Sequence, residues 1–414
     1  MTQKLVIIGA GMASGRMLEH LLEAAPGAHD ITLFNGEKRD NYNRLMLSPV
    51  LSGEKTYAQI VTHDDAWYAS HGITTRFGEA VVRIDRDRKL VVSAGGETRY
   101  DTLVLATGSA PFIIPVSGKD LPGAVTYRDL EDTNAMIAAS RPGANAVVIG
   151  GGLLGLEAAA GMAARRANVV VIHIMGHLME RQLDPSAGYL LQKDLERRGI
   201  TVHCKGATKA ILGHGRVEAV LLEDGTAYPA DLVCMAVGIH PEVRLANDAH
   251  LDVGRGVTVD DRMTTSDPAI FALGECVEHD KQLFGLVAPL HDQARVLAAT
   301  LAGQATAFRP VQTATKLKVT GVDLFSAGDF ADGPGREDIV FRDPGRGIYK
   351  RLVIEGDRLL GAVMYGDTAD GAWFLSQIKD GTDITPLRDT LIFGPAFQGG
   401  DPIGPFGSRC SLAA

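Results

Sequence analysis

Cysteine is scarce in this chain of 414 residues, and its four cysteines lie far apart. They are Cys204, Cys234, Cys276 and Cys410, and no two form a C-x-x-C pair. This spacing supports neither a disulfide framework nor a zinc or iron–sulfur site within the chain. Scattered free thiols favour a reducing compartment.

The sequence also lacks a basic excess and a long apolar run. Its net charge of −9 argues against a general nucleic-acid or anionic-membrane partner, although a local basic patch stays open. The most apolar window, residues 147–164, contains Glu157 and is mostly glycine and alanine, which makes a poor membrane span. The first residues run directly into a glycine-rich turn, without the apolar stretch of a signal peptide. We therefore expect a soluble, cytoplasmic protein.

Glycine is abundant: 48 of the 414 residues are glycine, well above the usual share of about 7%. With 45% hydrophobic and 22% charged residues, the chain can bury a core and is not disordered. Its length predicts two to three domains at about 150 residues each. The glycines therefore need a structural explanation within globular domains.

One pattern of apolar residues and glycines occurs twice. Residues 4–8 form an expected strand, followed by a turn from Gly9 to Ser14, a helix, and a second strand at 31–34. Residues 146–149 are followed in the same way by Gly150 to Gly155, a helix, and a strand at 169–172. Such βαβ units place backbone N–H groups and a helix N-terminus against a dinucleotide pyrophosphate. The alternative is a tight turn that binds no ligand.

Three other expected strands end in glycine. Thr107 and Gly108 follow an apolar stretch at 102–106, Gly238 follows 231–237, and Gly274-Glu275 follows 269–273. In open α/β sheets, ligands bind beyond the carboxyl ends of the strands. These turns are therefore expected to hold a cofactor.

These motifs together resemble the two-dinucleotide flavoprotein disulfide reductase superfamily over roughly residues 1–310. The resemblance implies an α/β fold with two Rossmann-like domains, the NADH domain inserted in the FAD domain, and a smaller C-terminal α+β interface domain. The expected boundaries are 1–118 and 248–310 for the FAD domain, 119–247 for the NAD(P)H domain and 311–414 for the C-terminal domain. The redox dithiol of the disulfide reductases is absent, because residues 40–50 contain no cysteine.

A more specific resemblance begins at Glu37. Residues 37–48 match the pattern E-x-x-x-x-Y-x-R-x-x-L-S of ferredoxin-, rubredoxin- and nitrite-reductase-type flavoproteins, although Pro49 replaces a frequent lysine. The stretches 178–184, 285–289, 315–323 and 349–354 resemble two proteins of nitrogen assimilation. They are the FAD module of the assimilatory NAD(P)H nitrite reductase large subunit and the electron-transfer subunit of assimilatory nitrate reductase.

The resemblance implies two sets of cofactor-binding residues. For FAD they are Gly9, Gly11, Ser14, Glu37, Arg44, Ser48, Val81, Thr107, Gly108, Arg128, Gly274 and Glu275. For the nicotinamide nucleotide they are Gly150, Gly152, Leu154, Gly155, Glu157, His173 and Gly238. Hydride transfer to a flavin needs positioning more than acid–base chemistry, so we expect no catalytic side chain and no metal ligand.

Four of these residues have plain alternatives. Glu37 could be a solvated loop charge and Arg44 a surface ion-pair partner. Glu157 is either an acid near the nicotinamide or a helix N-terminal charge. His173 stands where an acid would hold the NADH ribose, and it is either a ribose contact or a half-buried packing residue. No arginine cluster follows it, which favours NADH over NADPH.

The expected function is that of an FAD-dependent NADH oxidoreductase that passes electrons to a separate redox partner. The first expectation for the partner is the catalytic subunit of assimilatory nitrate reductase. Nitrite reductase, another iron–sulfur or rubredoxin-type carrier, and a non-catalytic FAD- and NADH-binding regulator are the alternatives. A homodimer is also open. Only Cys410 follows residue 395, so we expect that this chain alone cannot reduce nitrite.

Overall fold

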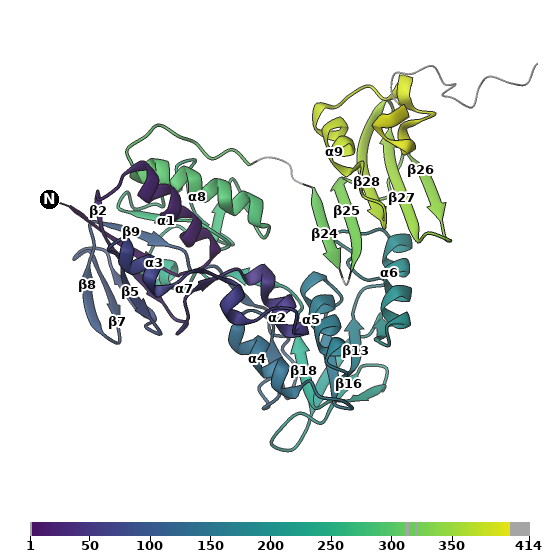
Figure 1. The fold of residues 1–414 in the computed structure, drawn as a ribbon, viewed down its shortest axis with the longest axis horizontal. Coiled ribbons are helices and arrows are strands. Elements are labelled where there is room, and N and C mark those ends of the chain that lie inside the picture. Colours follow the sequence, from purple (N-terminus) through teal and green to yellow (C-terminus); the bar gives the residue numbers. More distant parts are fainter. Residues whose placement is uncertain (1, 311–313, 320, 398–414) are drawn as a thin grey trace, which may run out of the picture. The chain divides into compact units, whose positions relative to one another are not determined.

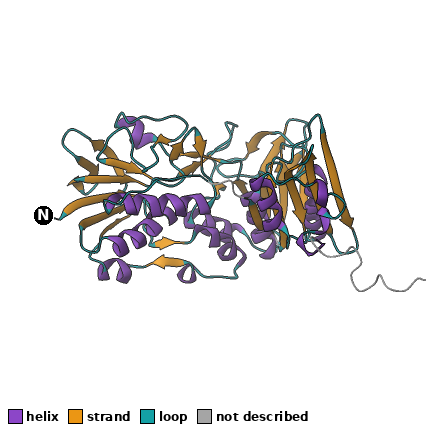
Figure 2. Ribbon diagram, turned by 90° about the horizontal axis from the view of Figure 1, so that it is seen from above, coloured by secondary structure: helices purple, strands orange, loops and turns teal. Residues whose placement is uncertain are grey.

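The structure is a computed structural model that describes residues 2–310, 314–319 and 321–397. These residues divide into two compact units. The first comprises residues 2–115, 125–139 and 235–310, and the second comprises 116–124, 140–234 and the described residues after 313. Helices and strands are mixed in both units (Figure 2). The four-segment domain boundaries expected above are not tested by this division and stay a prediction.

The first unit contains a parallel sheet in the order β21-β9-β1-β2-β5. Its strands are β1 (Gln3–Ile8), β2 (His29–Asn35), β5 (Thr74–Phe77), β9 (Thr102–Leu105) and β21 (Ile270–Ala272). Residues 5–8 of β1 are all buried, as expected for a central parallel strand that is covered on both faces. Helices α1 (Met12–Ala24) and α8 (Val287–Leu301) pack side by side (Figure 1).

Smaller elements complete this unit. The helices are α2 (Leu47–Ser52), α3 (Asp65–Ser70), α4 (Leu130–Ala139) and α7 (Arg244–Asp248), with 3-10 turns at Arg44–Met46 and Tyr57–Gln59. The strands are β3 (Asn41–Tyr42), β4 (Val61–His63), β6 (Val81–Asp85), β7 (Leu90–Ser93), β8 (Gly96–Arg99), β10 (Ser109–Pro111), β19 (Ile239–Pro241), β20 (Val257–Thr258), β22 (Val277–His279) and β23 (Gln282–Leu283). Strand β11 (Ala124–Thr126) crosses the boundary between the units.

The second βαβ pattern lies in a five-stranded sheet of the order β11-β18-β12-β13-β14, in which β12, β13 and β14 are parallel. The strands are β12 (Asn145–Ile149), β13 (Asn168–His173), β14 (Thr201–Cys204) and β18 (Leu232–Met235), accompanied by α5 (Leu153–Ala164) and α6 (Pro185–Arg197). A three-stranded sheet adds β15 (Thr208–Leu212), β16 (Ala219–Leu222) and β17 (Ala227–Pro229). Both expected βαβ units are therefore confirmed.

The C-terminal part of the second unit is an antiparallel sheet in the order β24-β25-β28-β27-β26. Its strands are β24 (Thr315–Val319), β25 (Val322–Gly328), β26 (Arg336–Asp343), β27 (Ile348–Glu355) and β28 (Arg358–Tyr365). Helix α9 (Gly371–Asp380) covers β25 and β28 (Figure 1), and 3-10 turns follow at Thr385–Leu387, Leu391–Phe393 and Pro395–Phe397. Phe374 of α9 is fully buried in the core of this sheet. The fold is thus two Rossmann-like domains and a smaller α+β domain.

Candidate functional site

The first glycine turn connects β1 to α1. Gly9 has φ +110°, and a Cβ there would lie 2.2 Å from the carbonyl oxygen of Ala106 on the neighbouring strand end. Gly11 is the N-cap residue of α1 and provides no side-chain cap, and a Cβ there would meet nothing within 4 Å. Ser14 is buried and donates a hydrogen bond to the Gly11 carbonyl at 2.9 Å. The turn therefore leaves the helix N–H groups open to an anion, which fits the pyrophosphate of FAD.

Asn41 holds this turn in place. Its Nδ2 donates to the carbonyl oxygens of Ala10 at 2.9 Å and Gly11 at 2.8 Å, and the side chain is buried. The hydroxyl of Thr62 donates to Asn41 Oδ1. The sequence did not single Asn41 out, because its partners lie 30 and 31 residues earlier. Its only sequence signal is its place next to Tyr42 of the E-x-x-x-x-Y-x-R pattern.

Glu37, Tyr42 and Arg44 form one cluster, in which Tyr42 is buried and the two charged side chains are half-buried. The Tyr42 hydroxyl donates to Glu37 Oε2 at 2.8 Å, and the Arg44 guanidinium pairs with Glu37 Oε1. The same guanidinium lies 5.0 Å from the centroid of the Tyr42 ring. Burial raises the pKa of Tyr42, so the phenol stays protonated and donates. Glu37 is therefore an oriented carboxylate rather than a solvated loop charge, and its contact with the FAD ribose stays a prediction.

A second cluster joins three chain segments at Glu275. Glu275 Oε2 accepts hydrogen bonds from Arg128 Nη2 at 2.6 Å and from the Ser109 hydroxyl at 2.7 Å. Gly108 has φ +71°, and a Cβ there would lie 3.4 Å from Arg128 Nη2. Sequence reasoning missed Ser109, although it follows Gly108 directly. The cluster brings together Gly108, Arg128 and Glu275, three of the residues expected to contact FAD.

The other residues expected to contact FAD are held by hydrogen bonds or by packing in the core. The Gly274 N–H donates to Gln293 Oε1 at 2.8 Å, and the Thr107 hydroxyl donates to the carbonyl of Glu242 at 2.8 Å. The hydroxyl oxygens of Ser48 and Tyr127 are 3.0 Å apart. Val81 begins β6 and belongs to the buried core. The contacts of these residues with FAD stay a prediction.

The second glycine turn has the same construction as the first. Gly150 has φ +123°, and a Cβ on Gly155 would lie 2.0 Å from the Gly150 carbonyl oxygen. Gly152 is the N-cap residue of α5 and provides no side-chain cap, and a Cβ there would meet nothing within 4 Å. Leu154 is exposed and Glu157 is half-buried on the first two turns of α5. This turn therefore fits the pyrophosphate of a nicotinamide nucleotide.

His173 is a packing residue of this second turn. It is 6% exposed, its Nδ1 accepts a hydrogen bond from the Gly151 N–H at 3.0 Å, and its Nε2 lies 3.0 Å from Glu180 Oε2. Both ring nitrogens are thus engaged by the protein, which supports the packing alternative over a direct ribose contact. Gly238, also expected near the nicotinamide nucleotide, has φ +119°, and its carbonyl accepts from the Phe112 N–H at 2.9 Å within the first unit.

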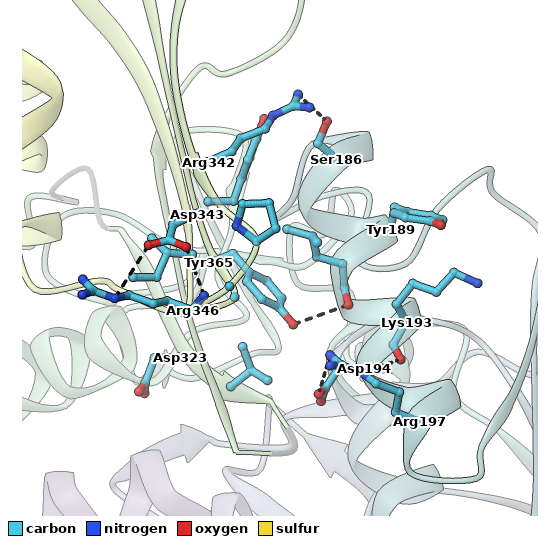
Figure 3. Close-up of a pocket in the computed structure, with 18 of the residues that line it drawn as sticks. Ser186, Tyr189, Lys193, Asp194, Arg197, Asp323, Arg342, Asp343, Arg346 and Tyr365 are labelled. Carbon is cyan, nitrogen blue, oxygen red and sulfur yellow. Dashed lines mark hydrogen bonds and ion pairs between the residues drawn. The ribbon is translucent and has the colours of Figure 1, made fainter.

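A cleft of about 910 Å³ lies between α6 and the turns of the C-terminal sheet (Figure 3). The Tyr365 hydroxyl donates to the Leu190 carbonyl at 3.4 Å, and Arg342 reaches Ser186 at the same distance. The other basic side chains of the lining are paired with acids, Lys193 with Glu196, Arg197 with Asp194 and Arg346 with Asp343. Because most of its basic side chains are already paired with acids, we assign no ligand to this cleft.

Neither thiols nor a metal cluster gives the described residues a second redox centre. Cys234 and Cys276 are buried and Cys204 is half-buried, and none of these three forms a disulfide; Cys410 lies outside the described residues. Burial raises the pKa of Cys276, which disfavours a reactive thiolate. Asp261, His279 and Asp280 lie close together, but Asp261 pairs with Arg309 and the two carboxylates face opposite nitrogens of the imidazole. We therefore assign no metal to them.

Comparison with known proteins extends these observations. The model of the pyridine nucleotide-disulphide oxidoreductase family matches residues 3–316, and that of the rubredoxin NAD+ reductase C-terminal domain matches 314–382. The chain is 43% identical to a nitrite reductase [NAD(P)H] of Bacillus subtilis over 96% of its length and 49% of the relative's. It is 38% identical to the assimilatory nitrate reductase electron transfer subunit of the same organism, over 96% of this chain and 52% of that one.

A solved structure shows a similar fold over nearly the whole chain. A ferredoxin reductase from Rhodopseudomonas palustris superposes with a TM-score of 0.83 at 26% identity, covering 94% of this chain and 97% of that one. By contrast, the chain spans about half the length of the first two curated relatives. Their whole activities therefore do not transfer to it directly.

The chain belongs to the pyridine nucleotide-disulphide oxidoreductase family. It is an FAD-dependent NAD(P)H oxidoreductase, and the two open glycine turns fit these two cofactors. FAD, when bound, supplies hydride acceptance and single-electron release. The role of the chain's own residues is to bind the two cofactors and to orient them. Among the described residues, no helix has both the length and the apolar character needed to cross a membrane.

Proposed function

We propose that the chain takes electrons from NADH through FAD and delivers them to a separate redox protein, the catalytic subunit of an assimilatory nitrate reductase. The observation that carries this proposal is the pair of open glycine turns, at Gly11 and Gly152, in a chain without a reactive dithiol near residues 40–50. Two dinucleotides can bind, and the described residues hold no further redox group to which the electrons could pass. The similarity to the nitrate reductase electron transfer subunit supports this acceptor.

The first test separates an electron-transfer enzyme from a regulator. The FAD-loaded protein is mixed with NADH and ferricyanide, and NADH oxidation is followed in the steady state. We expect multiple turnovers. If FAD is bound and NADH is not oxidised, the electron-transfer function is wrong and a non-catalytic binding role takes its place.

The second test identifies the acceptor. The tagged chain is purified from nitrate-grown cells, and its partners are assayed for reduction by NADH. We expect a molybdenum nitrate reductase to co-purify and to accept electrons. Recovery of only a sirohaem protein would replace nitrate reductase by nitrite reductase as the acceptor, and sedimentation of the purified chain tests the homodimer.

A small iron–sulfur or rubredoxin-type carrier is the second candidate acceptor. Residues 314–382 match the C-terminal domain of rubredoxin NAD+ reductase, which favours this alternative. Rubredoxin and a plant-type ferredoxin are therefore included as acceptors in the NADH assay. Faster reduction of either carrier than of nitrate reductase would favour it.

A further inference from the structure

The acid expected for the NADH ribose is missing at the end of β13. In Rossmann folds an acidic residue about 20 positions after the glycine turn accepts hydrogen bonds from the ribose hydroxyls. Here that position is His173, which is buried and bonded through both ring nitrogens. If a carboxylate holds the ribose in this chain, a residue other than His173 supplies it.

The chain returns to the glycine turn a few residues after His173. The Met179 N–H donates to the Gly151 carbonyl at 3.0 Å, and a Cβ on Gly151 would lie 2.6 Å from Leu178 Cδ2. Met179 takes a left-handed conformation with φ +53° and is fully buried. This contact places the next residue, Glu180, beside the second glycine turn, which is expected to face the nucleotide.

The hydrogen bonds of His173 orient the Glu180 carboxylate. Because Nδ1 accepts from Gly151, the ring proton is on Nε2, and Nε2–H donates to Glu180 Oε2 at 3.0 Å. The Glu180 side chain keeps 27% exposure. It is therefore fixed at one oxygen and accessible to solvent at the mouth of the turn.

We propose that Glu180, positioned by His173, accepts hydrogen bonds from the adenosine ribose hydroxyls of NAD(H) and excludes a 2′-phosphate by charge repulsion. This inference rests on the proposed use of NADH, and it identifies Glu180 as the residue that selects NADH over NADPH. The loop after β13 also contains a cation close by, because Lys205 Cε lies 3.6 Å from a Cβ position on Gly176. Lys205 is exposed, whereas Glu180 is tied to the turn itself, so the carboxylate decides the preference.

The test is calorimetric binding of NAD+ and NADP+ to the oxidised, FAD-loaded protein, which needs no turnover. We expect the wild type to prefer NAD+. Glu180→Gln, which keeps the size and removes the charge, should weaken NAD+ about tenfold and strengthen NADP+ relative to it. Glu180→Asp should keep the preference for NAD+ with a smaller loss. The matched control is Glu196→Gln, which removes a carboxylate on α6 that is paired with Lys193; it should change neither affinity.

Other outcomes would overturn the inference. If Glu180→Gln melts like the wild type and leaves the ratio of the two affinities within about twofold, Glu180 does not select the nucleotide. An equal loss of both affinities would mean that Glu180 only supports the turn. Lys205→Met should weaken NADP+ alone, and a loss of NAD+ there would contradict the assignment. A wild type that binds neither nucleotide would refute the proposed function as well, which separates the two failures.

Discussion

Arg128 and Glu275 are 147 residues apart in the sequence, and the structure brings Arg128 Nη2 to 2.6 Å from Glu275 Oε2. Both side chains are mostly buried, so each charged group needs the opposite charge of the other to offset the cost of its burial. The pair lies next to Gly108 and Ser109, at a strand end that is expected to contact FAD. The orientation of the Glu275 carboxylate therefore depends on a residue from a distant segment.

Arg128→Gln tests this dependence. Without the guanidinium, Glu275 loses one of the two hydrogen bonds described above and keeps that from Ser109, at a cost of about 1–3 kcal/mol. We expect FAD to bind about tenfold more weakly, measured by fluorescence titration of the apoprotein. Arg88→Gln, which breaks an exposed pair with Glu97, is the control and should have no effect. Unchanged FAD affinity in Arg128→Gln would refute the role of the pair.

Gly9→Ala tests the first glycine turn. The methyl group would lie 2.2 Å from the Ala106 carbonyl oxygen at φ +110°, so the turn must move. Gly27→Ala is a matched control, because Gly27 also has positive φ, +72°, but meets nothing within 4 Å. The control should lose about 1–2 kcal/mol from backbone strain and keep FAD. Gly9→Ala should lose FAD, seen as loss of flavin absorbance after gel filtration; equal behaviour of the two variants would contradict this.

Asn41→Asp tests the residue that holds the same turn. The substitution keeps the shape but turns the donor into an oxygen that faces the carbonyls of Ala10 and Gly11. A buried polar group without its partner costs about 1–3 kcal/mol, so the melting temperature and FAD affinity should both fall. Asn43→Asp is the control, because Asn43 caps a 3-10 turn through its Oδ1, which aspartate retains. If both variants melt at the same temperature, Asn41 does not hold the turn.

Tyr349→Phe tests how the C-terminal sheet is held to α6 within the second unit. The Tyr349 hydroxyl donates to Asp184 Oδ2 at 2.7 Å, and Asp184 also caps α6 by accepting from the Ala187 N–H. Loss of this buried bond should cost about 1–3 kcal/mol of unfolding free energy, measured by urea denaturation. When Asp184 is already replaced by Asn, Tyr349→Phe should lower the free energy of unfolding by less than it does in the wild type. Additive effects would show that the two residues do not interact.

The ion pair of Asp367 is expected to make the folded state less stable in acid. Its hydrogen bond with the buried Lys350 ammonium, at 2.8 Å, lowers the pKa of Asp367. A carboxyl whose pKa is lower in the folded state stabilises the fold above its unfolded pKa, about 4, and this contribution disappears as the pH falls through the folded pKa. Asp367→Asn should therefore lower the melting temperature at pH 7 and flatten its decline below about pH 4. Exposed Asp357→Asn is the control, and an equally steep acid decline in Asp367→Asn would contradict the assignment.

The sequence by itself determined the two βαβ units and their glycine turns. Gly9, Gly150 and Gly155 are required by backbone conformation or by contacts within a few residues and one neighbouring strand, so their pattern is visible in one dimension. The lack of a dithiol in residues 40–50 was equally plain. From these features the family and both cofactors could be predicted.

Only the tertiary structure decided which side chains complete the turns. Asn41 reaches back to Ala10, and Arg128 reaches Glu275, across chain segments whose approach depends on how the sheet and helices pack. The local pattern favoured His173 as a ribose contact no more than as a packing residue. The structure supports the packing role, because Gly151 and Glu180 contact the two ring nitrogens of His173. Hydrogen bonds between residues that are distant in the sequence leave no repeating pattern along the chain. They can therefore be recognised only when the packed structure brings the residues together.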